Sequence, residues 1–178
     1  MKKRWIWILP GLVVLLLDRL VKIITYGMHV TLIDGVIAIR SAKNTGMALG
    51  LMEGNALLIL IAGAILSFIC YLVLRKMQLS GFAPLCLSLM AGGAIGNALD
   101  RLVYGHVLDM FELLFINFYI FNVADIGVVC GAILCGYSLL FRPQDWREKC
   151  FGNLPEMEIG WIRCFPRMGR SAAPVLQH

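Results

Sequence analysis

The chain has 178 residues, of which 60% are hydrophobic and only 15% are charged, and its formal net charge is +5. An ordinary soluble domain does not need so many apolar residues, so the composition predicts an all-α protein that crosses a membrane several times. The basic residues cluster at the ends of apolar segments and do not alternate with aromatic residues along one face, which argues against a nucleic-acid partner.

Four apolar segments follow one another, and each is long enough to cross the hydrocarbon core as a helix. The first is too long for a signal-peptide core and is followed by similar segments, so we interpret it as a transmembrane helix. We predict a four-helix transmembrane domain over residues 1–142 and a tail over residues 143–178. The predicted helices span about 5–26, 56–74, 82–103 and 118–141.

The basic residues predict the orientation of these helices. Clusters of Lys and Arg precede the first helix, follow the second and follow the fourth, whereas the opposite side carries only Arg40 and Lys43 in its first loop. By the positive-inside rule, the N-terminus and the C-terminus are both cytoplasmic, and the tail is a cytoplasmic extension.

The loop over residues 27–55 therefore lies on the outer side. Apolar and β-branched residues alternate around Asp34-Gly35, which predicts a β-hairpin or small sheet. Residues 43–46 form a predicted turn, and the short apolar run 47–52 predicts a short helix on the membrane surface.

Polar residues interrupt three of the four predicted helices at a similar depth. With a rise of about 1.5 Å per residue, all of them lie in the outer part of the membrane. A charged side chain in the middle of a bilayer costs about 2.5–3.5 kcal/mol, so these groups should pair inside the bundle. They are Asp18 and Lys22 in the first helix, Asn97, Asp100 and Arg101 in the third, and Asn122 and Asp125 in the fourth.

Several of these residues have simple structural interpretations. Asp18 and Lys22 are spaced as an i,i+4 ion pair. Arg101 can extend toward the headgroups with Asp100 as its partner, and Glu112 has the position of a solvated loop acid. Asp109, in the connection between the third and fourth helices, and Asp125 have no cation nearby in sequence, so they suit a carboxylate pair.

A pair of close carboxyl groups can act as acid and base at one site. The two groups cannot both ionise cheaply, so one keeps its proton. The ionised group can then take a proton from water while the other polarises a peptide carbonyl, which is aspartic proteolysis. This chemistry needs no metal or cofactor, and the six cysteines form neither a CxxC pair nor a zinc-binding pattern with histidine.

Five short motifs carry a resemblance to a known family, in order and with agreeing spacing over roughly residues 4–142. The chain resembles the type II signal peptidases, the bacterial lipoprotein signal peptidases. The motifs are Asp18–Lys22, Lys43–Ala48, Gly92–Arg101, Gly105–Phe111 and Phe121–Asp125.

The resemblance implies a function and a site. Asp109 and Asp125 would be the catalytic dyad of an intramembrane aspartic endopeptidase in the bacterial inner membrane. The substrate would be a prolipoprotein, cut on the N-terminal side of its diacylglyceryl-cysteine, and globomycin-type cyclic peptides would inhibit the enzyme. The supporting and substrate-binding shell would be Asp18, Lys22, Asn44, Asn97, Asp100, Arg101, Asn122 and Ala124.

The chain departs from the family pattern at two motif positions. Leu49 stands where the family usually has an aromatic residue, and Met110 where Phe is common. These departures bear on loop packing and inhibitor affinity and leave the chemistry unaffected.

Two other functions would use the same buried acids. An ion-coupled transporter would employ them as proton relays, although the polar residues do not continue to the cytoplasmic side and no inverted repeat is present. A scaffold without activity would use the polar layer to bind a partner helix. Ion flux in liposomes would indicate the transporter, and loss of assembly without any hydrolysis would indicate the scaffold.

Overall fold

The computed structural model describes residues 4–46 and 56–148. The predicted surface helix over 47–52, Leu49 and the tail beyond residue 148 lie outside the described residues.

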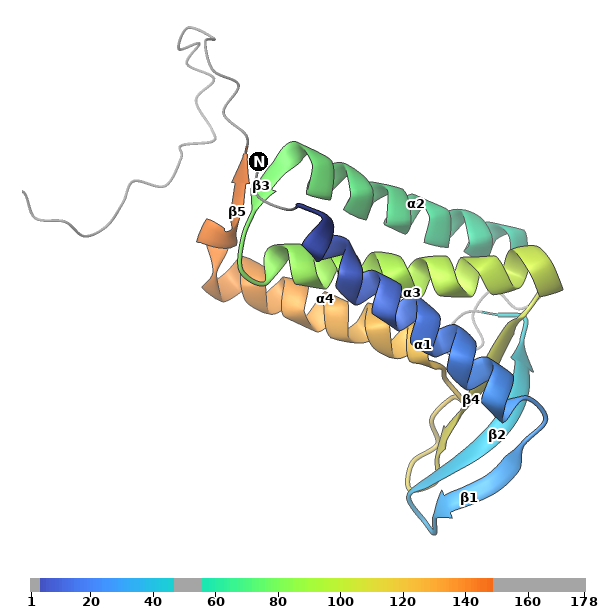
Figure 1. The fold of residues 1–178 in the computed structure, drawn as a ribbon. Coiled ribbons are helices and arrows are strands. Elements are labelled where there is room, and N and C mark those ends of the chain that lie inside the picture. The colour runs from blue at the N-terminus through green and yellow to red at the C-terminus, as the bar shows by residue number, and fades with distance from the viewer. Residues whose placement is uncertain (1–3, 47–55, 149–178) are drawn as a thin grey trace, which may run out of the picture.

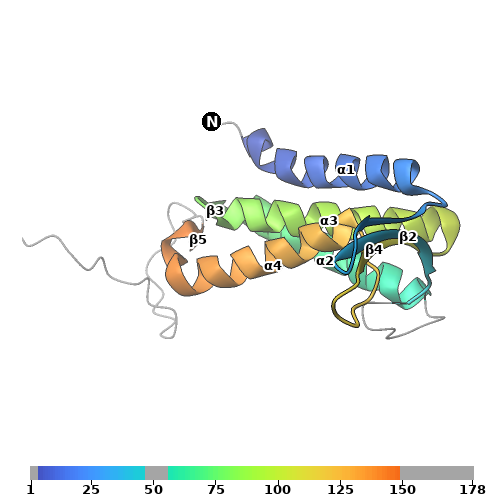
Figure 2. The same cartoon turned by 90° about the horizontal axis from the view of Figure 1, so that it is seen from below.

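Four helices form the body of the molecule (Figures 1 and 2). They are α1 (Leu9–Thr25), which is preceded by a 3₁₀ turn over Arg4–Ile8, α2 (Ala56–Lys76), α3 (Ala83–Tyr104) and α4 (Val123–Phe141). The third helix contacts the other three, so α3 is the central element of the bundle. The largely helical fold predicted from composition is thereby confirmed.

The fourth helix begins at Val123, about five residues later than the sequence predicts. Phe121 instead pairs with Phe111 in an antiparallel bridge, with N–O distances of 2.9 and 3.0 Å in the two directions. Asn122 is in an extended conformation and caps the helix, because its side chain accepts a hydrogen bond from the Asp125 N–H. The Asp125 carboxylate accepts from the Asn122 N–H in return, and this capping box fixes the helix start.

Two adjacent glycines let α3 approach its neighbours at backbone contact. A Cβ atom placed on Gly92 would lie 2.2 Å from the Gly11 carbonyl oxygen of α1, and one on Gly93 would lie 2.3 Å from the Ala124 carbonyl oxygen of α4. Distances this short exclude any side chain. The polar residues of α3 are therefore held close to the start of α4.

A three-stranded antiparallel sheet lies beyond one end of the bundle, in the order β1-β2-β4 (Figure 1). Strands β1 (His29–Ile33) and β2 (Ile37–Asn44) form the predicted hairpin around Asp34-Gly35. The predicted turn over residues 43–46 is partly wrong, because Lys43 and Asn44 belong to β2. The third strand, β4 (Val107–Leu113), had been predicted only as a connection, and it carries Asp109.

A second, two-stranded sheet lies at the opposite end of the helices. It joins β3 (Met77–Leu79) to β5 (Trp146–Glu148), which follows a 3₁₀ turn over Pro143–Asp145. Asp145 is buried and accepts a hydrogen bond from the Phe82 N–H at the start of α3, at 3.1 Å. The first residues of the predicted tail are therefore folded against the bundle.

Two described helical segments, Ile59–Lys76 and Val123–Phe141, are long and apolar enough to cross a membrane. The other two long helices, α1 and α3, carry charged residues of the polar layer, and neither meets the criteria of length and hydropathy together. Four membrane spans were predicted, and length and composition support two of them.

Candidate active site

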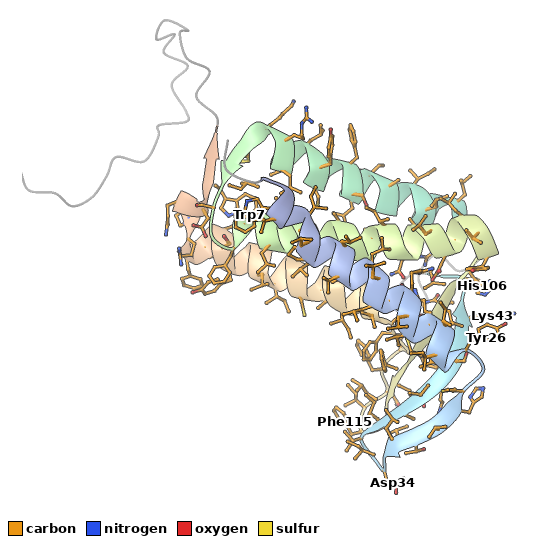
Figure 3. All side chains as sticks on the ribbon, in the orientation of Figure 1. Trp7, Tyr26, Asp34, Lys43, His106 and Phe115 are labelled. Atoms are coloured by element: carbon orange, nitrogen blue, oxygen red, sulfur yellow. The ribbon has the colours of Figure 1, made fainter. Side chains whose placement is uncertain are left out.

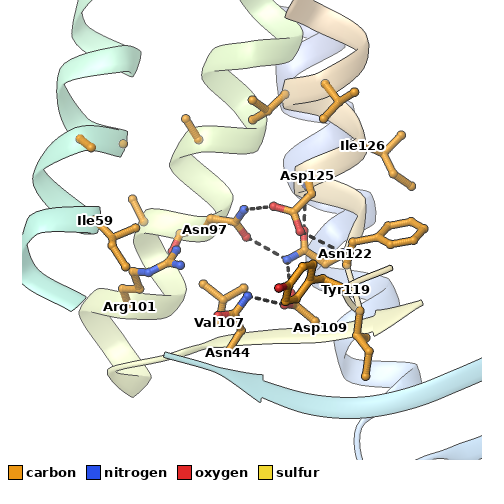
Figure 4. A pocket seen from close by; sticks show the side chains of 18 of the residues that line it. Asn44, Ile59, Asn97, Arg101, Val107, Asp109, Tyr119, Asn122, Asp125 and Ile126 are labelled. Carbon is orange, nitrogen blue, oxygen red and sulfur yellow. Dashed lines mark hydrogen bonds between the residues drawn. The ribbon is translucent and has the colours of Figure 1, made fainter. Parts of the chain in front are cut away.

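Asp109 and Asp125 line one cavity of about 540 Å³ (Figure 4). Helices α2, α3 and α4 form its apolar wall, and the ends of β2 and β4 close its polar side. Four more of the predicted site residues line it, which are Asn44, Asn97, Arg101 and Asn122. The structure thus brings together most of the residues that the motifs singled out.

Each acid is placed by an element with little freedom. Asp109 lies on β4 opposite Ala42 of β2, and it is 2% exposed. Asp125 is the third residue of α4 and takes part in its capping box. Backbone hydrogen bonds fix the pairing of β4 with β2, and the capping box fixes the start of α4, so both elements that carry the carboxylates are held in place.

Both carboxylates are bound by amides (Figure 4). The Asn44 side chain donates to one oxygen of Asp109 at 2.8 Å, and the Asn122 side chain donates to the other at 2.6 Å. The Asn97 side chain donates to Asp125 at 2.7 Å. Asn122 also bonds to the Asn97 side-chain oxygen at 3.1 Å, so one residue links the two acids. Within the described residues, neither acid forms an ion pair.

The pKa of the Asp109 carboxyl is raised above the ordinary value of an aspartate. Burial raises its pKa most, the charge of Asp125 raises it further, and the amides of Asn44 and Asn122 together with Lys22 lower it, which brings the pKa to about 6. When one of two neighbouring acids keeps its proton to a higher pH than usual, that acid can act as a general acid and the other as a general base.

Two further aspartates at the same level are bound in a different way. Asp18 accepts from Lys22 and Arg19, both at 2.7 Å, and Asp100 accepts from Lys22 at 2.6 Å and from Arg19. The predicted Asp18–Lys22 pair is confirmed. The predicted Asp100–Arg101 pair is wrong, because Asp100 points to the cations of α1.

The ion-paired cluster reaches the start of α4 through the backbone. The second oxygen of Asp18 accepts from the Ala124 N–H at 3.0 Å. Ala124 itself is fully buried, and a larger side chain would have no room there. The cluster therefore helps to hold the helix turn that carries Asp125.

Arg101 bonds to the segment after β2 and not to its sequence neighbour Asp100. It donates to the Gly46 carbonyl at 2.7 Å and to the Asn97 carbonyl at 3.3 Å. Glu112, predicted to be solvated, instead pairs with Arg40 across the β2–β4 ladder. Met110 is fully buried, in keeping with an apolar position.

Sequence reasoning did not single out Arg19, which binds Asp18, Asp100 and the Gly96 carbonyl. Its position directly after Asp18 hides it from the i,i+3 and i,i+4 rules that identify one helix face. The cost of a charge inside a membrane helix was the available signal. Among the described residues, no cluster of three or more His, Cys, Asp or Glu side chains is arranged to hold a metal ion.

Comparison with known proteins shows which family this chain matches. Residues 11–141 match the family described as signal peptidase (SPase) II. The chain is 34% identical over 148 residues to the lipoprotein signal peptidase of Latilactobacillus sakei subsp. sakei (strain 23K), which covers 78% of this chain and 96% of the relative.

Two further similarities agree with this match. The lipoprotein signal peptidase of Enterococcus faecalis (strain ATCC 700802 / V583) is 38% identical over 126 residues, covering 70% of this chain and 78% of that protein. A solved structure described as "Bacterial membrane enzyme structure by the in meso method at 2.3 A resolution" superposes with a TM-score of 0.72 at 28% identity. It covers 80% of this chain and 92% of the other.

Proposed function

Because this chain belongs to the signal peptidase II family, we propose that Asp109 and Asp125 are the catalytic dyad with which it cleaves its substrates. The protein is an aspartic endopeptidase that removes signal peptides from prolipoproteins. This activity replaces the transporter and scaffold hypotheses. The observation that supports the dyad is that the buried Asp109 and the partly buried Asp125 line one cavity, bound by amides and by no cation among the described residues.

The reaction follows from two carboxyl groups that share one proton. The ionised carboxylate takes a proton from a water molecule as the water attacks the scissile carbonyl carbon. The protonated carboxyl donates to the carbonyl oxygen, and a tetrahedral diol forms. When the C–N bond breaks, the nitrogen of the leaving segment takes the proton of the carboxyl that had deprotonated the water. One hydroxyl of the diol gives its proton to the other carboxylate as the new C=O forms, so the dyad is again singly protonated.

The surrounding residues would hold the dyad in the geometry that this reaction needs. Asn44, Asn97 and Asn122 donate to the carboxylates and fix their rotamers. An amide donor carries no net charge, so it orients an acid without suppressing the protonated form as strongly as a cation would. Asp18 acts through the Ala124 N–H, and Asp100 acts by completing the ion pairs of Lys22 and Arg19.

We place the cavity at the outer surface of the bacterial inner membrane, with both termini cytoplasmic and residues 1–142 forming a four-span domain. The apolar side chains on the helix surfaces support this placement, since Ile23 of α1 is 76% exposed and Leu140 of α4 is 77% exposed. Helix α2 ends in Arg75 and Lys76, at the end of the bundle opposite the three-stranded sheet (Figure 1).

The substrate that fits this site is a precursor carrying a diacylglyceryl-cysteine. The cavity wall on α2 and α4 is apolar, with Ile59, Leu66 and Val129 among its residues, so acyl chains or the apolar part of a signal peptide can lie there. The scissile bond would then sit at the polar end, beside the dyad. A globomycin-type inhibitor would occupy the same cavity, with its peptide at the polar end.

The test is cleavage of a diacylglyceryl-modified precursor peptide by the purified protein in a bilayer. Asp109→Asn and Asp125→Asn should each reduce kcat by at least about 10²–10⁴-fold, the usual contribution of general acid–base catalysis. Asp34→Asn is the matched control, because Asp34 lies in the hairpin turn away from the cavity.

The controls separate chemistry from folding. Each variant should bind a globomycin-type inhibitor and retain its helix content, which shows that the bundle is intact. Normal turnover by either dyad variant would refute the assignment of that residue.

A further inference from the structure

A second cavity, of about 520 Å³, lies on the α1 side of α3 and shares no lining residue with the first. The ends of α1 and α3 form one part of its wall, and β2 with the start of β4 forms another. Figure 3 shows three of its lining residues, Tyr26, Lys43 and His106, beside one another at this end of the bundle. The catalytic proposal makes no use of this cavity.

The wall of this cavity carries an excess of positive charge. Its charged residues are Arg19, Lys22, Lys43 and Asp100. Asp100 is already bonded to Lys22 and Arg19, and these two cations also neutralise Asp18 behind the wall. Two acids therefore balance two of the three cations. Lys43 is exposed and forms no ion pair with the described residues.

Further hydrogen-bond donors line the same space. The hydroxyl groups of Tyr26 and Tyr104 belong to side chains that are 70% and 64% exposed. The His106 Nδ1–H donates to the Tyr104 carbonyl at 2.9 Å, so the other nitrogen of the neutral ring is an acceptor and His106 adds no free donor to the wall. The Arg19 Nε–H, behind this surface, is buried and has no hydrogen-bond partner among the described residues. A wall rich in donors, whose acids are already satisfied, suits an anion.

The cavity also borders an apolar surface. Ile23, in its wall, is 76% exposed, and Val103 near the end of α3 is 68% exposed. Tyr26 directly follows α1, and Tyr104 is the last residue of α3. Tyrosine at the end of a membrane helix favours the interface between acyl chains and headgroups. An occupant of the cavity would thus have its polar part among cations and its apolar part beside exposed aliphatic side chains.

From this combination we propose that the second cavity binds the phosphodiester headgroup of an anionic phospholipid from the outer leaflet. Lys43 and the tyrosine hydroxyls contact the phosphate, and the acyl chains run along Ile23 toward the membrane interior. A free phosphate would use only the polar part of this surface, and a zwitterionic lipid would bring its own cation against Lys43. The inference rests on the membrane placement proposed above.

The site adjoins the ion-paired cluster. Lys22 and Asp100 line the cavity and at the same time belong to the network that holds the Ala124 N–H through Asp18. A bound headgroup therefore closes the exposed side of that network and stabilises the end of α1 against α3.

The test measures lipid retention without any turnover. The full chain is placed in nanodiscs of equal parts phosphatidylglycerol and phosphatidylcholine, released, and examined by native mass spectrometry. The wild type should retain phosphatidylglycerol in preference to phosphatidylcholine. Lys43→Gln should reduce this preference by about fivefold, the scale of one basic side chain beside an anionic headgroup.

Arg40→Gln is the matched control. Arg40 lies on the same strand, loses the same charge on substitution, and does not line the cavity. It should leave the preference unchanged. Tyr104→Phe, which keeps the ring and removes only the hydroxyl, should lower the retention of phosphatidylglycerol by a smaller factor than Lys43→Gln.

The remaining outcomes each overturn the proposal in a different way. Equal losses in Lys43→Gln and Arg40→Gln would mean that surface charge alone attracts the lipid. Complete displacement by millimolar inorganic phosphate would mean a site for free anions. Wild-type protein that does not enter the nanodiscs would contradict the membrane placement itself. None of these results depends on the dyad, whose failure would appear only in the cleavage assay.

Discussion

Four aspartates lie in one layer of this molecule, and they form two pairs with opposite surroundings. Asp18 and Asp100 are bonded to Lys22 and Arg19, whereas Asp109 and Asp125 are bonded to asparagine amides and to a backbone N–H. Asp18, Asp100 and Asp109 are buried and Asp125 is partly buried, so burial alone does not distinguish the two pairs. The difference lies in the charge of the donors.

The comparison shows how a protein separates structural acids from reactive ones. A cation stabilises the ionised form of a buried carboxylate, and such a group stays charged and structural. An amide orients a carboxylate while leaving it free to take a proton. Burial first, and then the charge of the neighbouring Asp125, raise the pKa of Asp109 to about 6.

The largest contrast should appear in stability. Asp100→Asn leaves Lys22 and Arg19 to share the single charge of Asp18, so one buried positive charge is no longer balanced. Breaking a buried pair in this way typically costs about 3–5 kcal/mol. Asp109→Asn removes one of two neighbouring like charges and gives up one hydrogen bond from an amide, so it should cost much less stability than Asp100→Asn. Thermal unfolding of both variants in the same detergent compares them, and a similar loss in both would contradict the separation into structural and reactive pairs.

A large effect on activity should follow from a substitution that pushes α3 and α4 apart. Gly93→Ala places a methyl group 2.3 Å from the Ala124 carbonyl oxygen, so α3 and α4 must separate, and Asn97 moves away from Asp125. A shift of about 1 Å in a catalytic group can reduce the rate by about 10²-fold. Gly136→Ala on α4 is the control, because nothing lies within 4 Å of its added Cβ. Equal kcat/KM values in the two variants would show that the close packing is unnecessary.

The pH dependence should reveal the electrostatic link between the pairs. The dyad works with one shared proton, so kcat/KM should fall on the alkaline side as that proton is lost, with an apparent pKa near 6. Lys22 lowers the pKa of Asp109, so Lys22→Met should move this limb to higher pH. The pH–rate profiles of the two proteins measure the shift, and a limb that moves to lower pH would contradict the assignment.

The smallest effect should come from the ion pair outside the layer. Arg40 and Glu112 have side chains that are 51% and 28% exposed, and pairs of this kind contribute about 0–1 kcal/mol. Arg40→Gln should therefore shift thermal unfolding much less than Asp100→Asn. A comparable loss would mean that the β2–β4 pairing depends on this ion pair.

Much of the site could be predicted because each polar residue had to be explained against an apolar background. Asp18, Asn97 and Asp125 could be identified because a polar group costs free energy inside an apolar helix, and the helical rise predicted that they lie at one depth. The hairpin around Asp34-Gly35 was equally clear, since its turn residues and alternation are local features.

The errors occurred where a residue's partner is far away in sequence. Asp100 was matched to its neighbour Arg101, but its partners are on α1, 78 and 81 residues away. The strand that carries Asp109 was missed because β4 forms only when β2 is beside it. The start of α4 was placed too early, since the bridge between Phe121 and Phe111 competes with helix for the same residues.

The amino-acid sequence by itself determined the helical class and the layer of polar residues, because these depend on local periodicity and on the cost of a charge among apolar residues. The two candidate catalytic acids were identified by their lack of a cation nearby in sequence and by the family motifs that contain them. Only the tertiary structure decided which acids meet cations and which meet amides. That choice depends on how closely α3 packs against α1 and α4, and the backbone contacts at Gly92 and Gly93 that permit this packing link residues far apart in the chain.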